Sequence, residues 1–530
     1  MKKIISFNNI DPQKKVLVIG AGYSGLLLGL MLKEKKIPYL IVEKNSQPGG
    51  VWISQGNATS KVQIDPVAYA ALSAATSIPP AYTPTEEITA EFKRIADDLD
   101  IAYNVNVQKI TQQGKLHRVQ LLSGGHIDAA AVAIRTGTLT QPKAITYPNE
   151  SIFKGTITYG IKNNISPSDF KGKNVVIVGM GAFAIENMRT AFENGAKHIT
   201  IVARHIKPVL PKMCSYEAAR FITNLKNMFV KSYRNESWNR FFTVLDEMYQ
   251  TTGNQTLINR ACTTDENGDR YFNCTGSAVS DTFFIALSEG KLTVIESEIA
   301  SFKESSITTK SNETIDTNMV VKCIGSTCDT TLAEKLLTKT IFMNGPSVTH
   351  NLRADCIGAP FIMGPNEAIP IPPLVSYAML SDVIDTTAIY SYRYPKRYKA
   401  FINKTTYMNP ERECISNLNY QSYIKFFWSI LTSGETGLVE EIYDRFAQRQ
   451  KIYQEKLNYK TAYENNQKEW QQKTNTPYPL KGLATEEPAN TTPVSTYKRL
   501  YKVASWVGID RVLGWLKYRP IQRLLDWLLT

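Results

Sequence analysis

The sequence lacks the paired cysteines and clustered histidines that mark disulfide frameworks and metal centres. Its seven cysteines are scattered along the chain, and no two of them form a Cys-x-x-Cys pair. Its five histidines are equally dispersed and show no ligand spacing such as His-Glu-x-x-His. We therefore expect reduced thiols rather than disulfides, and no bound metal.

Long apolar runs are missing as well. No stretch approaches the ~18 apolar residues that cross a bilayer, and the apolar run near the N-terminus ends too early for a secretory signal. We therefore expect a cytoplasmic protein. A chain of 530 residues is too long for one hydrophobic core, so two or three domains are predicted.

Acidic residues are in the minority, and the formal net charge is +13. The basic residues are spread through the chain and match no nucleic-acid-binding motif, so we expect no nucleic-acid partner. Anionic cofactors, or an anionic membrane surface, are the partners that such a charge favours.

What the sequence does contain, near its start, is the pattern of a dinucleotide-binding βαβ unit. Residues 16–19 form a short β-branched run that predicts a buried parallel strand, and a Gly-x-Gly-x-x-Gly turn and an apolar helix follow. Gly20 permits the tight turn, Gly22 lets the backbone approach a pyrophosphate, and Gly25 allows close packing of helix on strand. The second strand ends in Glu43, which is placed to accept hydrogen bonds from a ribose.

A second glycine turn follows at residues 47–52. Its paired glycines, including Gly50, would let the backbone pass close to a flat ligand, which Trp52 would cover. The alternative interpretation is an ordinary loop with a core tryptophan.

The next elements complete the first domain. We predict a helix with Thr85 as its N-cap, because two acidic residues follow it. Alternating residues predict two antiparallel strands within 103–122. A further buried strand, 130–134, leads to Thr136 and Gly137, and small residues at a strand end suit a backbone that lies against a cofactor.

A second dinucleotide fingerprint follows another buried strand. Gly179, Gly181 and Ala184 form a Gly-x-Gly-x-x-Ala turn before a helix. The next strand ends in Arg204, at the place where the first unit has Glu43. An arginine can bind a ribose 2′-phosphate with two hydrogen bonds, which favours NADP over NAD. The alternative is a surface arginine without a ligand.

The rest of the chain is less regular. Residues 213–275 are polar and aromatic, and they predict a lid or an insertion. A later strand ends at Gly325, which repeats the pattern at Gly137. A Gly-Pro-Asn passage that ends in Asn366 then precedes a helix from about residue 373, and this helix would point at the cofactor of the first domain.

This order of elements resembles that of the flavin-containing monooxygenases and their Baeyer–Villiger relatives, over about residues 15–390. The resemblance implies an α/β fold with two Rossmann-like domains, the second inserted in the first. The first fingerprint would then bind FAD and the second NADPH. The cofactor-binding residues implied are Gly20, Gly22, Gly25, Glu43, Gly50, Trp52, Thr136, Gly137, Gly179, Gly181, Ala184, Arg204, Gly325 and Asn366.

The same resemblance gives the domain boundaries. Residues 1–150 would form the first part of the FAD-binding domain, and 151–330 the NADPH-binding domain with its insertion at about 213–275. Residues 331–390 would return to the FAD-binding domain. Residues 391–530 lie beyond the resemblance, and we expect them to form a mainly helical C-terminal extension.

The activity implied is an NADPH-dependent FAD monooxygenase, which inserts one oxygen atom from O₂ into a small organic substrate through a flavin hydroperoxide. The oxygenated atom would be a heteroatom or a carbonyl carbon. Asp65 sits where the Baeyer–Villiger branch has an acid close to the flavin, so it is the candidate catalytic residue, with a solvated loop aspartate as the alternative.

The family signature, Phe-x-Gly-x-x-x-His, is matched only in part. Phe153 and Gly155 fit it, but Tyr159 stands in place of the histidine. This departure leaves a second function open, an NADPH oxidoreductase that uses a flavin without inserting oxygen. A nucleotide-sensing protein without enzymatic activity is the third.

The last segment, residues 497–530, is apolar and basic, with seven Lys and Arg residues against two Asp residues. Such a tail lies either on an anionic membrane, as a peripheral contact, or on the protein's own body. The sequence specifies neither the substrate nor the oligomeric state.

Overall fold

The computed structural model describes the two nucleotide-binding regions and part of the C-terminal extension. Two predicted site residues, Asp65 and Asn366, lie outside the described residues. So do the helix predicted from about residue 373 and, apart from Arg499, the tail 497–530. The described residues are 11, 15–63, 82–113, 116–137, 141–214, 231–264, 270–273, 278–327, 346–348, 354–357, 385–386, 389–390, 393–394, 436–456, 459–480 and 499.

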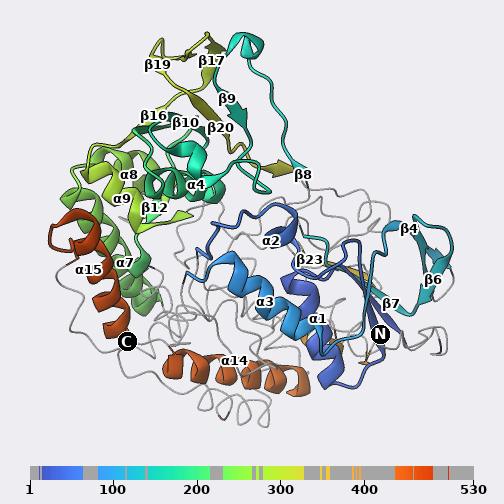
Figure 1. Ribbon diagram of the computed structural model, residues 1–530. Helices are drawn as coiled ribbons and strands as arrows, with labels where there is room; N and C mark the ends of the chain where they lie inside the picture. Colours follow the sequence, from blue (N-terminus) through green and yellow to red (C-terminus); the bar gives the residue numbers. More distant parts are fainter. Residues whose placement is uncertain are drawn as a thin grey trace.

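The first sheet has six strands in the order β22-β23-β7-β1-β2-β3 (Figure 1). Strand β1 pairs in parallel with β2 and β7, which brings Ile19 level with Val42 and Ile134. The carboxyl ends of these three strands therefore meet at one edge. The bounds are β1 Val16–Ile19, β2 Tyr39–Glu43, β3 Ile101–Tyr103, β7 Ala131–Ile134, β22 Pro346–Val348 and β23 Ala354–Ile357.

Both faces of this sheet are covered. Successive residues of a strand point to opposite sides, and each set of β1 side chains is buried in a cluster of its own. Val16 and Val18 pack in one cluster with helix α1, and Leu17 and Ile19 pack in another with a three-stranded meander. We call the sheet with these covering elements the first unit. Its other elements are α1 Tyr23–Glu34, α2 Val51–Ser54, α3 Thr85–Ala96, β4 Val107–Gln113, β5 Leu116–Leu121 and β6 His126–Ala129.

The start of α3 differs from the prediction. Pro84 is the N-cap, and Thr85 is the first helical residue. Pro84 has extended backbone angles, φ −69° and ψ 157°, so it is the residue just outside the helix. The predicted cap was therefore wrong by one residue, because Thr85 already lies inside the first turn, where its hydroxyl donates to the carbonyl oxygens of Asn57 and Ser60 at 3.0 and 2.9 Å.

The second sheet has five parallel strands in the order β16-β11-β10-β20-β9. Its alternating side chains again separate two clusters: Val175 and Ile177 face α4 and α9, and Val176 and Val178 face the three-stranded sheet of β17, β18 and β19. We call this assembly the second unit. Its elements are β9 Thr156–Thr158, β10 Asn174–Val178, α4 Ala182–Glu193, β11 His198–Ala203, α9 Asp281–Ser288, β16 Leu292–Glu296, β17 Ile299–Phe302, β18 Ser306–Thr309, β19 Thr314–Asp316 and β20 Met319–Lys322.

The segment predicted as a lid or an insertion contributes to the core of the second unit. Leu245 and Tyr249 on helix α7 and Ile258 on helix α8 are buried in the same cluster as Ile177. The Tyr249 hydroxyl donates to the carbonyl oxygen of Val209 at 3.1 Å. The elements here are β12 Val209–Leu210, α7 Lys231–Thr251, α8 Gln255–Ala261, β13 Cys262–Thr264, β14 Arg270–Phe272 and β15 Ala278–Val279.

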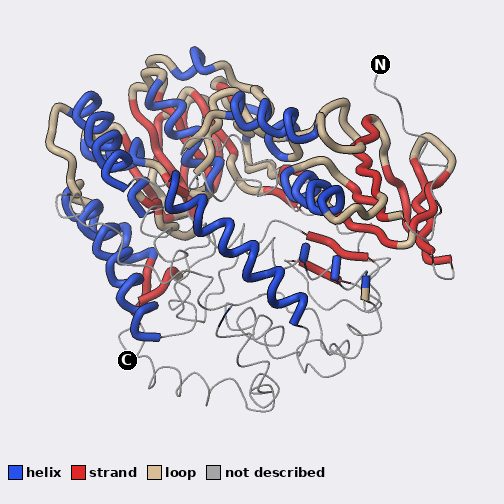
Figure 2. The backbone as a smooth tube through the Cα atoms, turned by 90° about the horizontal axis from the view of Figure 1, so that it is seen from below, coloured by secondary structure: helices blue, strands red, loops and turns tan. Residues whose placement is uncertain are grey.

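A pair of short strands links the connections that leave the two sheets. The connections out of the two units pair with each other, because β8 and β21 run antiparallel. Figure 2 shows the strands of the two units as separate groups with helices packed against them. The remaining bounds are β8 Gln141–Pro142, the 3₁₀ turns Glu150–Ile152 and Pro167–Phe170, and β21 Ser326–Thr327.

Two C-terminal helices, α14 Thr436–Lys456 and α15 Tyr459–Thr474, contact different units (Figure 1). Arg445 on α14 pairs with Glu34 on α1 at 2.9 Å. On α15, Trp470 is buried in the core of the second unit, and Glu469 pairs with Lys212 at 2.5 Å. Within the described residues, none of the helices is both long and apolar enough to cross a membrane.

Candidate functional site

The first glycine turn is too crowded for side chains at two of its three glycines. Gly20 has a φ of +107°, and a Cβ there would lie 2.6 Å from the carbonyl oxygen of Arg135. A Cβ on Gly25 would lie 1.9 Å from the carbonyl oxygen of Gly20. Turn, helix α1 and the end of β7 are therefore in direct backbone contact, which places the helix start at the edge where the strands end.

The middle glycine of this turn lies against the second glycine turn. A Cβ on Gly22 would lie 3.3 Å from Cα of Gly50, and the Gly49 amide donates to the carbonyl oxygen of Ala21 at 3.1 Å. Gly22 is also the N-cap of α1 and has no side chain to cap it. The N–H groups of a first helical turn favour an anion, so this helix start is suited to a phosphate.

Glu43 lies at the same turn and is buried, with 4% of its surface exposed. One carboxylate oxygen accepts a hydrogen bond from the Ala21 amide at 2.7 Å, and the other accepts from the Asn45 amide at 2.9 Å. The Asn45 side-chain amide donates to the carboxylate as well, at 2.7 Å. A carboxylate has about four lone-pair sites, so about one is left to accept from a ribose hydroxyl. The end of strand β2 thus brings Glu43, the residue predicted to bind the ribose, next to the predicted phosphate site.

Trp52 lies in the short helix α2, half-buried against the cluster that contains helix α1. This packing fits the interpretation as a core tryptophan, and its contact with a cofactor stays a prediction. Two strand ends leave room instead. Gly137 and Gly325 have φ values of +75° and +89°, and no described atom lies within 4 Å of a Cβ at either residue. A flat ligand could lie against the backbone there.

The glycine turn of the second unit, residues 179–184, repeats the backbone geometry of the turn at residues 20–25. Gly179 has a φ of +107°, and a Cβ there would lie 2.4 Å from the carbonyl oxygen of Cys323. Gly181 is the uncapped N-cap of α4, and no described atom lies within 4 Å of a Cβ on it. Ala184, in the first turn of α4, is fully buried. A second helix start is thus open to a phosphate, at the carboxyl end of a second parallel sheet.

Arg204 follows β11 directly, at the position that Glu43 occupies in the first unit. Its side chain is 75% exposed, and Nε lies 3.9 Å from Oε1 of Glu298. Glu298 also pairs with Lys310. An exposed guanidinium at this strand end is accessible to a phosphate, although its present state is that of a surface arginine.

Two buried basic residues at the strand ends were missed in the sequence. Arg135, just before Thr136, pairs with Asp385 at 3.1 Å, and both side chains are buried. Lys322, just after the apolar part of β20, pairs with Glu150 at 2.6 Å. The available signal was a lysine or arginine directly after a short apolar strand.

Tyr159, which replaces the signature histidine, lies next to this lysine. Its ring centroid is 5.5 Å from Nζ of Lys322, a cation–π contact. Tyr147 makes a similar contact from another side, at 5.6 Å. The aromatic rings and the Glu150 carboxylate together hold the lysine charge in place.

Comparison with known proteins agrees with two nucleotide-binding regions. The family described as pyridine nucleotide-disulphide oxidoreductase matches residues 17–213, and the family described as putative NAD(P)-binding matches residues 168–265. An FAD-binding monooxygenase of Aspergillus calidoustus is 27% identical over 206 residues, which are 34% of this chain and 33% of that protein. A ferredoxin–NADP reductase of Thermus thermophilus is 24% identical over 208 residues, which are 38% of this chain and 56% of that protein.

The fold comparison extends over more of the chain. The structure of an oxidised steroid monooxygenase bound to NADP superposes with a TM-score of 0.52, at 15% identity, over 79% of this chain and 98% of that chain. An identity this low shows similarity of fold alone. In sequence, the match spans only about a third of the length of the Aspergillus monooxygenase. The prediction of two Rossmann-like nucleotide-binding units is confirmed.

Proposed function

We propose, from its confirmed resemblance to the class B flavoprotein monooxygenases, that this chain is an NADPH-dependent FAD monooxygenase acting on a small organic substrate. One observation carries the proposal: two glycine turns with similar backbone geometry, each followed by an uncapped helix start, stand at the carboxyl ends of parallel strands in the two sheets. Glu43 is the last residue of strand β2 in one sheet, and Arg204 directly follows strand β11 in the other. This exchange supports binding of different nucleotides at the two turns.

FAD fits the first unit. Its pyrophosphate would lie on the helix start at Gly22, and its adenosine ribose would bond to Glu43. The backbone turn at Gly50 and the open strand end at Gly137 would border the rest of the cofactor. Bound FAD supplies the redox chemistry, since it can accept a hydride and react with O₂.

NADPH fits the second unit. Its pyrophosphate would lie at Gly181, and Arg204 would pair with the 2′-phosphate that distinguishes NADPH from NADH. The open strand end at Gly325 would border its nicotinamide half. The chain's own contribution is to bind the two nucleotides, orient them and keep water from the reacting atoms. Asp65 is our candidate for the acid nearest those atoms.

We further propose that the NADPH-binding domain is inserted in the FAD-binding domain. The first sheet takes strands from residues 16–134 and again from residues 346–357. In the sequence, these two groups precede and follow the strands of the second sheet. This order supports the predicted boundaries near residues 150 and 330. The helices α14 and α15 would belong to the C-terminal extension.

The test is oxygen insertion. Purified protein is supplied with NADPH, ¹⁸O₂ and a panel of small ketones and sulfides, and products are analysed by mass spectrometry. We expect FAD in the purified protein and a product that carries one ¹⁸O atom. NADPH oxidation that yields only hydrogen peroxide with every compound would contradict the proposal.

The similarity to a ferredoxin–NADP reductase favours a second candidate, an NADPH oxidoreductase without oxygen insertion. In that case NADPH would reduce an artificial electron acceptor such as ferricyanide at a high rate, and no compound of the panel would gain oxygen. The two assays together separate the candidates, because a monooxygenase needs O₂ for turnover and a reductase does not.

A further inference from the structure

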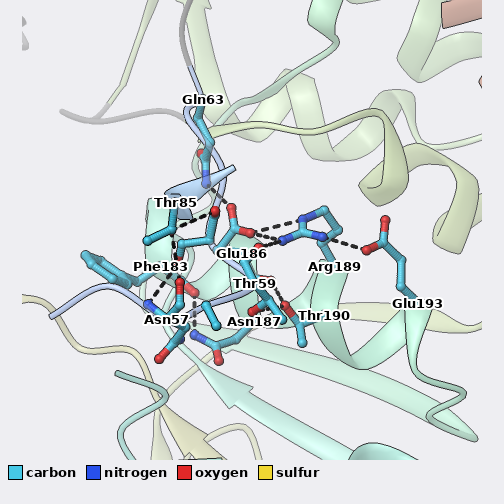
Figure 3. Close-up of polar contacts among 12 residues, drawn as sticks. Asn57, Thr59, Gln63, Thr85, Phe183, Glu186, Asn187, Arg189, Thr190 and Glu193 are labelled. Atoms are coloured by element: carbon cyan, nitrogen blue, oxygen red, sulfur yellow. Dashed lines mark hydrogen bonds and ion pairs between the residues drawn. The ribbon is translucent and has the colours of Figure 1, made fainter. Parts of the chain in front are cut away.

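The loop after α2 is bonded directly to helix α4 of the second unit. Figure 3 shows Gln63 and Thr59 of this loop beside Glu186 and Arg189 of the helix. We call the contact of residues 57–63 with α4 the joint. Helix α2 follows the turn at Gly50, and α4 begins at the glycine turn of the second unit. Only a few residues of chain therefore separate the joint from each of the two predicted cofactor turns.

Arg189 is the centre of the joint. One guanidinium nitrogen, Nη2, donates to the carbonyl oxygen of Thr59 and to the carboxylate of Glu186, and Nε donates to the same carboxylate at 3.0 Å. The third nitrogen, Nη1, donates to Glu193 at 2.5 Å. The side chain is only 11% exposed. One planar group therefore holds the first unit's loop against the second unit's helix.

Glu186 is bound from the other side by Gln63. The Gln63 amide donates to Oε2 of Glu186 at 3.1 Å and to the carbonyl oxygen of Ala182 at 3.0 Å. Burial raises the pKa of Glu186, and the Arg189 guanidinium and the Gln63 amide oppose this. For Arg189, burial lowers the pKa, but the carboxylates of Glu186 and Glu193 more than compensate, so the pKa is raised and the guanidinium stays protonated.

Asn57 adds a second set of bonds next to the joint. Its amide donates to the carbonyl oxygen of Gly160 at 2.7 Å, and Asn187 on α4 donates to the same oxygen at 3.0 Å. A Cβ on Gly160 would lie 2.7 Å from the Asn187 amide, so this residue has no room for a side chain. The loop, the connection between the units and α4 thus meet at one carbonyl group.

The joint continues to the C-terminal extension. Glu193, the last residue of α4, accepts from Lys473 on α15 at 3.3 Å, and Lys473 pairs with Glu469 at 3.0 Å. Helix α4 is therefore held at its outer end by α15 and at its inner end by the loop. Buried and partly buried charges in such a series of linked ion pairs resist separation, because each charge would lose its partner without regaining full hydration.

We propose that Arg189 and Glu186 are positioning residues that fix the glycine turn of the second unit relative to the glycine turns of the first unit. This inference rests on the proposed function. A hydride, with its two electrons, would pass from NADPH to FAD, which leaves NADP⁺ and two-electron-reduced FAD. That step requires the donor and acceptor atoms to lie about 3–3.5 Å apart, and a displacement of 1 Å can cost about a hundredfold in rate.

The test is stopped-flow reduction of the bound flavin by NADPH without O₂. For Arg189→Met we expect the limiting rate to fall by about one to two powers of ten, with the NADPH dissociation constant within about twofold of wild type, since Arg189 lies outside the turn that would bind the phosphates. Arg189→Lys should recover only part of the rate, because an ammonium lacks the planar fork. The matched control is Arg94→Met: Arg94 pairs with Glu91 on α3 in the same i,i+3 spacing, at 2.6 Å.

A second readout separates positioning from stability. After dithionite reduction, NADP⁺ is added, and the long-wavelength charge-transfer absorbance reports stacking of nicotinamide on flavin. We expect this band to weaken per bound NADP⁺ in Arg189→Met and to be unchanged in Arg94→Met. A merely structural role would lower the melting temperature without changing the band. If Arg189→Met does not retain FAD, the isosteric Glu186→Gln is measured in its place.

The outcomes are distinct. If NADPH does not reduce the wild-type flavin, the proposed function fails. If it does, and the variants that retain FAD show the wild-type limiting rate and charge-transfer band, the positioning role is overturned.

Discussion

The guanidinium of Arg135 lies 3.1 Å from the carboxylate of Asp385, and the two side chains are 0% and 2% exposed. Arg135 directly follows strand β7, and its carbonyl oxygen would lie 2.6 Å from a Cβ on Gly20. Asp385 comes from a segment far along the sequence. The ion pair therefore joins the later part of the chain to the base of the first glycine turn.

Removing one partner of this pair should destabilise the first unit. Asp385→Ala would remove a buried carboxylate from the buried Arg135 guanidinium, at a cost of about 3–5 kcal/mol in the free energy of unfolding. Urea unfolding followed by flavin fluorescence measures the loss. The control is Asp128→Ala: its pair with Arg118 is 24% and 32% exposed, so solvent screens it and its loss should change stability much less. Equal effects of the two substitutions would contradict the structural role of Arg135.

Gly22→Val should produce protein without FAD. The Cβ alone would lie 3.3 Å from Cα of Gly50, and the branched methyl groups would occupy the space at the helix start where the pyrophosphate must pass. The flavin absorbance of the purified protein measures the result. Gly437→Val serves as the control, because no described atom lies within 4 Å of a Cβ there. Normal flavin content in Gly22→Val would remove this turn from the FAD site.

Arg204→Ala should reduce the preference for NADPH over NADH. A charge-assisted contact is worth about 1.5–3 kcal/mol when buried, and the 75% exposure of Arg204 places the loss near the lower end, about tenfold in the NADPH concentration needed for half-maximal flavin reduction. NADH should be barely affected. Arg260→Ala is the control, since Arg260 is also exposed and paired with an acid, Glu296. An unchanged ratio of NADPH to NADH would mean that Arg204 has no ligand.

The Cys323 thiol should resist alkylation in the native protein. It lies beneath the first turn of α4, where it donates to the carbonyl oxygen of Phe183, and burial raises its pKa to about 12 although the residue as a whole is only partly buried. Because the folded pKa lies above the ordinary thiol value of ~8.5, this group's contribution to stability is present below pH ~8.5 and is lost as the pH rises towards 12.

Iodoacetamide labelling followed by mass spectrometry tests this. At pH 9 we expect Cys323 to be labelled only after unfolding in urea, with Cys323→Ala identifying the labelled peptide. Rapid labelling of the native protein would show that α4 does not cover the thiol.

The glycine turns were predictable from the sequence, and the contacts between the units were not. Strand β1, the turn at Gly20 and the strand that ends in Glu43 follow from local rules, because apolar periodicity and backbone sterics act within a few residues. Gln63 and Glu186 are 123 residues apart. A hydrogen bond between such distant polar residues leaves no local pattern, so neither residue was marked in the sequence.

The buried charges show the same limit. Arg135 and Lys322 could have been noticed as basic residues at the ends of apolar strands, but their partners, Asp385 and Glu150, carry no mark of their own. The misplaced cap at Thr85 has a related cause. The sequence shows that a hydroxyl is present, whereas the tertiary structure decides which backbone groups it bonds.

Tyr159 should make catalysis less sensitive to pH than a histidine at the same position would. Its ring lies 5.5 Å from Nζ of the buried Lys322, and Lys322 is also held by Glu150 at 2.6 Å. Imidazole is the side chain whose charge ordinarily changes between pH 5 and 8, and a phenol has no such change there. We therefore expect the ratio of oxygenated product to NADPH consumed to stay level between about pH 6 and 8.

Tyr159→His should make that ratio depend on pH, with the transition below the ordinary histidine value, because the neighbouring lysine cation disfavours a second positive charge. Tyr159→Phe keeps the aromatic face over Lys322 and is the matched control, which should behave as wild type. The measurement is product and hydrogen peroxide formed per NADPH at each pH, and a pH profile shared by the wild type and both variants would show that this position does not affect coupling.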